Sequence, residues 1–227
     1  MTGPMFTILI MGLFYSSCLA SGPSRRYPLH APWVTCSSED RKHSTTKKKV
    51  RTPLVTSSNG RLKAFAEIEA ERTRGGNCQT EVRLFVSEPG QEGFREVYDL
   101  KPSEAGGTLN SLGPIGWSPD GRWLLIEFGN WWEGSDAGGL GVLLYDSHAK
   151  TVSNTDLRSL IRRTLSRECS ITVVSVIGFN ASSQVLLRLA DSTDEGETEP
   201  LTHCFQGTES WGIDPGRSSA FHLTEHR

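Results

Sequence analysis

Acidic side chains in polar, glycine-containing stretches are the residues of this chain with the clearest capacity for acid–base chemistry. Two carboxylates that flank a scissile bond can hydrolyse it, as they do in most glycoside hydrolases. The candidates lie in three stretches predicted as loops, at 67–80, 129–141 and 191–200: Glu67, Glu133, Asp136 and Asp194. A hydrolase or lyase, or the remnant of a peptidase that has lost its catalytic domain, is therefore one hypothesis.

The sequence does not indicate serine chemistry. Gly116-Trp117-Ser118-Pro119-Asp120 departs from the G-x-S-x-G pattern of a nucleophile elbow. The six histidines are scattered along the chain. Because no nucleophile, base and orienting residue fit a catalytic pattern, we identify no catalytic residue and favour a non-catalytic role.

Two adjacent tryptophans, Trp131 and Trp132, stand in the second stretch beside Glu133 and Asp136. Neighbouring side chains of an extended chain point to opposite sides, so we expect at least one indole to be exposed. An exposed indole can stack on a sugar ring, a peptide or a partner's side chain. We predict that these four residues bind a ligand; the alternative is that both rings pack inside the fold.

The acidic stretch at 191–197 has the composition of a calcium loop without its spacing. Thr193 replaces one acid, and Thr202 stands where a bidentate Glu is required, so a solvated loop is predicted. The cysteines and histidines lack the spacings of zinc sites, and residues 138–141 lack the helix of a phosphate-binding loop. We expect neither a metal nor a cofactor.

The elements that must position these residues are strands joined by tight turns. Ser118-Pro119-Asp120-Gly121 has the residues of a β-turn, and the bulky run at 122–126 that follows it is typical of a buried strand. Related patterns occur at 54–65 and 177–187, the latter with a degenerate turn. Each copy is followed by a second strand-like segment, at 82–86, 142–146 and 210–214.

At these residues the chain resembles the TolB-type, WD-like (PD40-like) β-propeller repeat proteins, whose repeat carries W-S-P-D-G, a basic residue and a short apolar strand. The match is closest at 117–126. The resemblance implies an all-β fold of four-stranded antiparallel blades with long loops gathered on one face. We expect three units, at about 54–112, 113–168 and 169–223, in a small or incomplete propeller.

Three units are fewer than the four to eight blades of a typical closed ring. Residues 21–53 could supply another blade, a partner or second copy could complete the ring, or the sheets could form an open array. Those residues are rich in Ser, Pro and charge, with basic runs at 41–43 and 47–49, so we predict a partly disordered linker.

Residues 1–20 resemble a secretory signal peptide that ends before Ser21, although the leading segment lacks Lys and Arg. The alternatives are an uncleaved anchor, a misassigned start, or lipid attachment at Cys18. After cleavage no segment approaches the ~20 apolar residues of a membrane span. We predict a secreted or periplasmic protein.

Four cysteines remain after residue 20, an even number that favours two disulfides in an exported chain. Three connectivities are possible. We prefer Cys36 with Cys78, which would tie the N-terminal segment to the first unit, and Cys169 with Cys204 within the third.

One helix is predicted between the second and third units. Asn154 or Thr155 would cap it, and the apolar face would carry Leu157, Leu160, Ile161 and Leu165, with arginines at 158, 162, 163 and 167 on the solvated side. In the third unit, Asn180-Ala181-Ser182 is a glycosylation sequon, relevant only in a eukaryotic secretory pathway.

The net charge of −2 and the pI near 6.3 do not indicate a nucleic-acid binder. The favoured interpretation is an exported binding or scaffold module that recognises a protein, peptide or glycan of the cell envelope or outside the cell. Its long loops would form the binding face.

Overall fold

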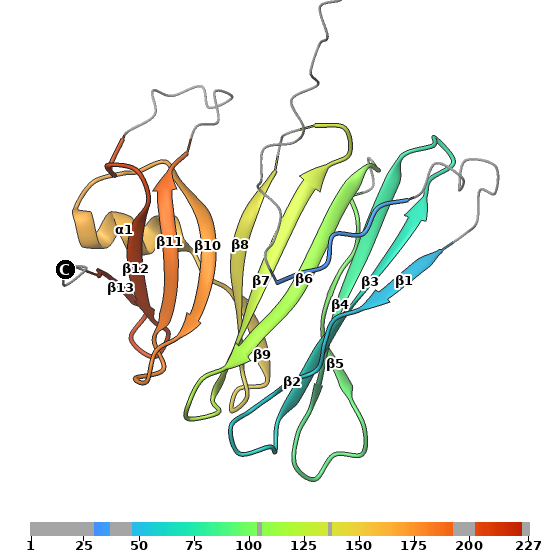
Figure 1. Cartoon of the computed structure of the whole chain (residues 1–227), viewed down its shortest axis with the longest axis horizontal. Coiled ribbons are helices and arrows are strands. Elements are labelled where there is room, and N and C mark those ends of the chain that lie inside the picture. Colours follow the sequence, from blue (N-terminus) through green and yellow to red (C-terminus); the bar gives the residue numbers. More distant parts are fainter. Residues whose placement is uncertain (1–29, 37–46, 104–105, 136–137, 193–202, 224–227) are drawn as a thin grey trace, which may run out of the picture.

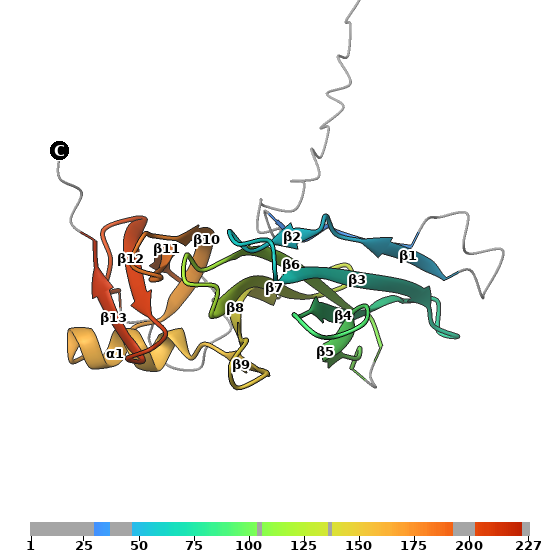
Figure 2. The same ribbon diagram turned by 90° about the horizontal axis from the view of Figure 1, so that it is seen from below.

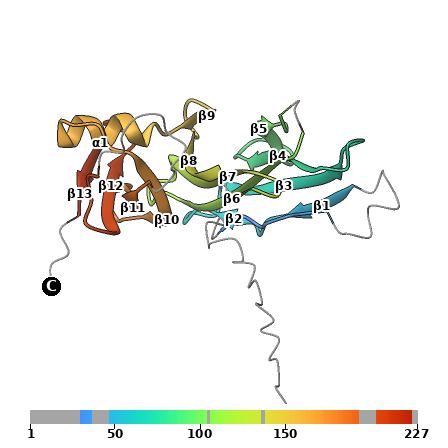
Figure 3. The ribbon, with the colours of Figure 1, turned by 90° about the horizontal axis from the view of Figure 1, so that it is seen from above.

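The computed structural model describes residues 30–36, 47–103, 106–135, 138–192 and 203–223. Within them the fold is all-β, as predicted: three antiparallel sheets and one helix (Figure 1). Sheet B lies between sheets A and C, which stand at opposite ends of an elongated arrangement (Figure 3). The sheets form an open array in this chain, and closure into a propeller ring stays a prediction.

Each sheet follows the order of the sequence. Sheet A contains β1 (Lys48–Arg51), β2 (Val55–Thr56), β3 (Lys63–Arg72), β4 (Cys78–Ser87) and β5 (Arg95–Leu100). Sheet B contains β6 (Thr108–Trp117), β7 (Trp123–Trp132), β8 (Gly138–Asp146) and β9 (Thr151–Asn154). Sheet C contains β10 (Ile171–Phe179), β11 (Val185–Asp191), β12 (Glu209–Asp214) and β13 (Ser219–His222).

Because β1 and β2 both pair with β3, they act as one interrupted first strand, and each sheet has four strand positions. The predicted unit boundaries need correction. The boundary at residue 112 falls inside β6, because that strand occupies the ten residues before the turn motif, which begins at Ser118. The first unit begins earlier than residue 54, because β1 pairs with β3 from Lys48 onward.

The turn motif reverses the chain between the first two strands of sheets A and B. In sheet B the backbone N–H of Gly121 donates to the carbonyl of Ser118 at 2.8 Å, and Ser118 Oγ accepts the N–H of Trp123 at 2.9 Å. In sheet A, Ser57 and Gly60 repeat these bonds. Ser118 is therefore a turn residue, as predicted.

The degenerate third turn keeps the geometry with different residues. Ser183 takes the positive-φ position (59°) that Gly121 occupies in sheet B. The side-chain oxygen of Asn180 accepts the N–H groups of Ser182 and Gln184 at 2.9 and 3.0 Å, and its amide nitrogen donates to Gln184 Oε1 at 2.7 Å. The sequon asparagine is thus half-buried and engaged in the turn.

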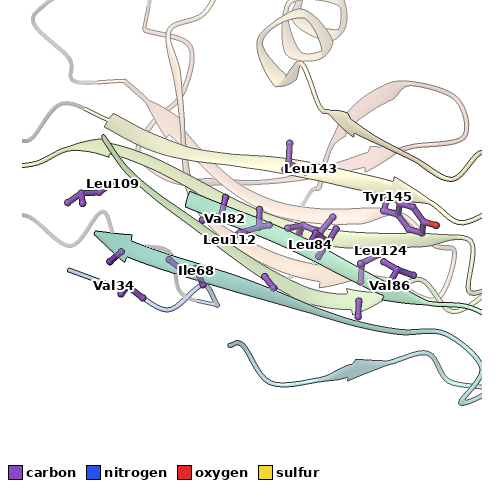
Figure 4. Close-up of a cluster of buried hydrophobic side chains, with 14 of the residues drawn as sticks. Val34, Ile68, Val82, Leu84, Val86, Leu109, Leu112, Leu124, Leu143 and Tyr145 are labelled. Atoms are coloured by element: carbon purple, nitrogen blue, oxygen red, sulfur yellow. The ribbon is translucent and has the colours of Figure 1, made fainter. Parts of the chain in front are cut away.

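An apolar cluster joins sheets A and B. Along β4, buried residues that face sheet B alternate with partly buried residues of the opposite face, as a strand with one buried side requires. Figure 4 shows the cluster, which includes Ile68, Val82, Leu84, Leu112 and Leu124. The run at 124–126 is fully buried, which confirms the prediction of a strand covered on both faces.

A second cluster joins sheets B and C and includes helix α1 (Leu157–Leu165). The helix lies beside β13 (Figure 2). Leu157, Leu160 and Ile161 are buried, as the predicted apolar face requires. The predicted cap was wrong by one or two residues: Asp156 is the N-cap, because its carboxylate reaches the N–H of Ser159 at 3.0 Å.

Residues 30–36 form a strap across sheet B, where a partly disordered linker was predicted. Ala31 and Val34 are buried, and Ala31 lies directly on Gly113 of β6, where a Cβ atom would meet the Ala31 backbone at 2.5 Å. The fully buried carboxylate of Glu127 accepts the backbone N–H of His30 at 2.9 Å. This correction extends the ordered domain toward the N-terminus.

Both preferred disulfides are confirmed. Cys36 bonds to Cys78 and fastens the strap to β4, and Cys169 bonds to Cys204 at the start of sheet C. Disulfides are typical of proteins that fold outside the reducing cytoplasm. In the part of the chain that the structure describes, no helix is long and apolar enough to cross a membrane.

Sheets A and C expose different kinds of side chain. On sheet A, the face turned away from sheet B carries ion pairs such as Lys49 with Glu67 at 2.6 Å and Lys47 with Glu69 at 2.6 Å. On sheet C, the bulged strand β10 exposes Val174 and Ile177.

Candidate binding surface at the β3–β4 and β7–β8 connections

The connections between the second and third strands are shorter than predicted in sheets A and B. β3 and β4 pair as far as Arg72 with Cys78, and β7 and β8 pair as far as Trp131 with Gly138. The polar residues that indicated long loops occupy strand positions. The third connection includes residues 193–202, which lie outside the described residues, as does Asp194. In Figure 1 the ends of β3, β7 and β11 lie at the same side of the array.

Trp131 is not available to a ligand, contrary to the prediction. Its indole packs edge-on against Trp33 of the strap, with ring centroids 5.2 Å apart. Gly129 and Gly138 border it closely, since a Cβ atom at either position would meet atoms of Trp131 at 1.9 and 2.6 Å. The strap that covers this ring was the feature that sequence reasoning missed.

Trp132, the next residue, is 43% exposed. The expectation that one of the two adjacent rings is exposed is confirmed, and its basis is the alternation of side chains along β7. Trp132 pairs with Thr108 of β6, so a regular strand position holds its backbone. Its role in binding stays a prediction.

Glu133 serves the hairpin tip rather than an open site. One carboxylate oxygen accepts the backbone N–H of Cys78, and the Glu133 N–H donates to the Gly107 carbonyl at 2.7 Å. The bond to Cys78 fastens the tip of the β7–β8 hairpin to sheet A, and the bond to Gly107 ties it to the segment that leads into β6. Asp136 lies outside the described residues.

A polar hollow of about 480 Å³ opens beside this anchored tip. Its polar walls come from the β3–β4 turn, the start of β4 and the segment after β5: Thr73, Arg74, Asn77, Gln79 and Ser103. Asn77 and Gln79 flank Cys78, which Glu133 contacts. Gly106, another wall residue, precedes Gly107. The polar turn residues inside the predicted 67–80 loop were the signal for this hollow.

A buried polar network supports the surface from below. Thr80 Oγ1 donates to the Asn110 carbonyl at 2.6 Å, and Asn110 Nδ2 donates to the Thr80 carbonyl at 3.0 Å. Asn130 Nδ2 donates to Asn110 Oδ1 at 2.6 Å. Because these bonds link β4, β6 and β7 in a buried setting, they hold sheets A and B in one arrangement at this end.

The acids that motivated the enzyme hypothesis are not brought together among the described residues. Glu67 lies within β3, where Lys49 and Arg51 contact its carboxylate at 2.6 and 2.9 Å. Burial acts to raise the pKa of Glu67, but the hydrogen bonds from these two cations outweigh it and lower the pKa. Glu133 is engaged with sheet A.

Asp191, at the start of the acidic stretch, has a structural task. Its carboxylate accepts the backbone N–H groups of Cys204 at 2.8 Å and Phe205 at 3.3 Å. Across the described ranges, no group of three or more His, Cys, Asp and Glu side chains is placed to hold a metal ion.

A scan against protein-family models and a search of curated proteins find no match for this chain.

Proposed function

We propose that this protein is an exported, non-catalytic module that binds its ligand at the end of sheets A and B where the β3–β4 and β7–β8 connections lie. The observation that carries the proposal is the exposed ring of Trp132 at a strand end fixed by Glu133, whose carboxylate contacts Cys78 between two residues that line the polar hollow. A binding site that is already rigid loses less conformational entropy when the ligand arrives.

The residues around the hollow favour a glycan over the other candidate ligands, a peptide or protein. An indole offers a flat apolar surface for the C–H face of a sugar ring. The hydroxyl, amide and guanidinium groups of Thr73, Asn77, Gln79 and Arg74 match the hydroxyl groups of a saccharide as hydrogen-bond partners.

Export to the periplasm or the cell exterior is part of the proposal. It rests on the signal-like residues 1–20 together with the two disulfides. The TolB-type propeller resemblance supports a binding role, because rigid blades position variable loops.

The experiment compares Trp132→Ala with Phe94→Ala. Phe94 is 42% exposed on the β4–β5 connection, outside the proposed site, and serves as the matched loss of an exposed ring. Each purified variant is tested for retention on a panel of immobilised oligosaccharides and peptides, and thermal melting monitors the fold.

Trp132→Ala is expected to weaken retention on at least one oligosaccharide by about ten-fold, since stacking on an aromatic ring contributes on the order of 1 kcal/mol or more. Phe94→Ala should retain wild-type binding. Equal retention by the two variants, with unchanged melting, would remove the proposal; selective loss on peptides would replace glycan with peptide as the ligand.

A further inference from the structure

A second hollow lies between sheets B and C, at the end of the molecule that carries the turn motifs. Its volume is about 430 Å³, within the range of small-molecule sites. Walls come from β7, β8, β9, α1 and the β12–β13 connection, so three separate parts of the chain build it. None of its lining residues belongs to the surface around Trp132.

The floor of this cleft is apolar. Trp123 and Leu144 of sheet B, Leu160 of α1 and Ile213 of sheet C line it. Leu144, Leu160 and Ile213 are buried members of the cluster between sheets B and C, so the floor is fixed by the core. Trp123 is partly buried and supplies an aromatic wall suited to a flat ring.

The rim of the cleft carries two arginines from α1. Arg163 donates one guanidinium N–H to the Ser218 carbonyl at 3.0 Å, which aligns it with the β12–β13 turn. A guanidinium has five N–H donors, so one bond leaves capacity for an anion. Arg162 pairs with Glu168 at 2.7 Å, and both side chains are more than half exposed.

The other charged groups at the rim do not cancel the positive charge of the two arginines. An exposed ion pair such as Arg162 with Glu168 contributes little to stability, so Arg162 can leave Glu168 and bind a ligand instead. Asp156 is the acid among the lining residues, and it caps α1. The hydrogen bonds from Ser159 lower the pKa of Asp156, and its charge is directed at the helix N-terminus.

We propose that the cleft between sheets B and C binds a small ligand that joins an aromatic or alicyclic body to a single carboxylate. The body lies in the apolar floor beside Trp123, and the carboxylate meets Arg163 and Arg162. Arginine suits this task because its planar fork matches the two oxygens of a carboxylate. This site is independent of the glycan surface, and either can exist without the other.

The test titrates the mature chain with 1-naphthoate and, separately, with the neutral analogue 1-naphthalenemethanol. Binding is followed by chemical-shift changes of backbone amides and indole N–H groups. Naphthoate should shift the Trp123 indole and amides of α1 and residues 213–218 in a saturable manner. The neutral analogue should bind about ten-fold more weakly or worse, because it lacks the charge-assisted hydrogen bonds.

The variants distinguish a specific anion site from non-specific attraction to the positive charge of α1. Arg162→Gln/Arg163→Gln should reduce naphthoate affinity by about ten-fold or more. Arg158→Gln is the control, since Arg158 is an exposed arginine of the same helix that is not among the lining residues of this cleft. It should leave the affinity within two-fold, by the usual tolerance of exposed sites.

Four results would overturn the proposal: no saturable shifts, shifts centred on other residues, equal binding of the acid and the alcohol, or equal loss in the Arg158 control. Failure here would leave the Trp132 experiment unaffected, because the two hollows share no lining residue.

Discussion

The two junctions of the array are built from different chemistry. Sheets A and B meet through an apolar cluster that polar bonds reinforce at both ends: Thr80 with Asn110 at one end, and Tyr145 with Glu88 and Arg95 at the other. Sheets B and C meet through apolar side chains and α1, and an open cleft remains between them.

The two junctions therefore differ in how firmly they hold their sheets and in whether they leave space for a ligand. Buried polar networks have few alternative arrangements, so the A–B junction fixes the angle between its sheets. Besides the apolar cluster and the polar networks, the strap and the Cys36–Cys78 disulfide also fasten the A–B junction. The B–C junction is held by apolar contacts together with hydrogen bonds from α1, Arg163 to Ser218 and Thr164 to Ala220. The cleft beside α1 leaves room for a ligand.

Removal of the Cys36–Cys78 bond should have the largest effect and should act at the A–B junction. For a sequence separation of 42 residues, the entropic model predicts a loss of about 4 kcal/mol in the free energy of unfolding for Cys36→Ala/Cys78→Ala. Urea denaturation measures it. Hydrogen exchange should also accelerate at residues 30–36 and around Trp131, because the strap is released.

Cys169→Ala/Cys204→Ala is the matched control, with a separation of 35 residues and therefore a similar loss of stability. Its exchange should accelerate in sheet C and not around Trp131. If both double variants expose Trp131 equally, the strap does not depend on its own disulfide and the contrast between the junctions fails there.

Ile161→Ala probes the B–C junction through its fully buried helix residue. We expect a loss of about 3 kcal/mol in the free energy of unfolding, from lost burial and the cavity left behind. Leu165→Ala, at the partly buried end of the same helix, should cost less. Chemical denaturation compares them, and a smaller loss for Ile161→Ala would mean that α1 is not a structural part of the junction.

Tyr145→Phe removes the buried hydroxyl that donates to Glu88 at the A–B junction. The Glu88 carboxylate keeps Lys150 at 2.9 Å but loses its buried donor, so we expect a loss of about 2 kcal/mol. Tyr98→Phe, a partly buried tyrosine of sheet A, is the control for loss of a phenol group. Equal losses of stability in the two variants would show that the Tyr145–Glu88 hydrogen bond adds no stability of its own.

The same pair should make the A–B junction sensitive to pH at both extremes. Burial acts to raise the pKa of Glu88, but hydrogen bonds from Tyr145 and Lys150 outweigh it and lower the pKa below the ordinary 4.5. The associated stability is present above pH 4.5 and is lost as pH falls further. Burial and the Glu88 bond raise the pKa of Tyr145 above 10.0, so its contribution is present below pH 10 and declines above it.

Stability measured against pH for wild type and Tyr145→Phe checks this expectation. The difference between the two proteins should shrink below pH 4.5 and above pH 10. A difference that stays constant across the range would mean that neither ionisation is linked to this junction.

Asp156→Ala should have the smallest effect, about 1 kcal/mol, through loss of the N-cap of α1. Thermal melting measures it, and Asn154→Ala, which was one of the two predicted caps, should cost less. A larger loss for Asn154→Ala than for Asp156→Ala would mean that the helix begins at the cap predicted from the sequence.

Features set by neighbouring residues were predictable from the sequence. The turn at Ser118 follows from Pro and Gly at fixed positions, and the buried face of α1 follows from the helical spacing of its leucines. Which of the two tryptophans is exposed was not predictable, because Trp33, 98 positions before Trp131, decides it.

The strap was missed for a related reason. Its composition is that of a linker, and its fit depends on the missing side chain of Gly113 and on the carboxylate of Glu127, both far along the chain. Glu67 was placed in a loop because its stretch is polar, yet alternation along β3 puts these carboxylates on the face that carries the ion pairs with Lys47 and Lys49.

Part of the outer face of sheet A is charged in a way that resists stacking. In repeat proteins, a terminal unit with a polar outer surface serves as a cap that seals the stack. Any sheet stacked on this part of sheet A would have to dehydrate the Lys49–Glu67 and Lys47–Glu69 pairs. Phe65, Phe85 and the 42% exposed Phe94 form an apolar area on the same sheet. For a protein engineer, these ion pairs are therefore the groups to replace before a further unit is stacked on sheet A.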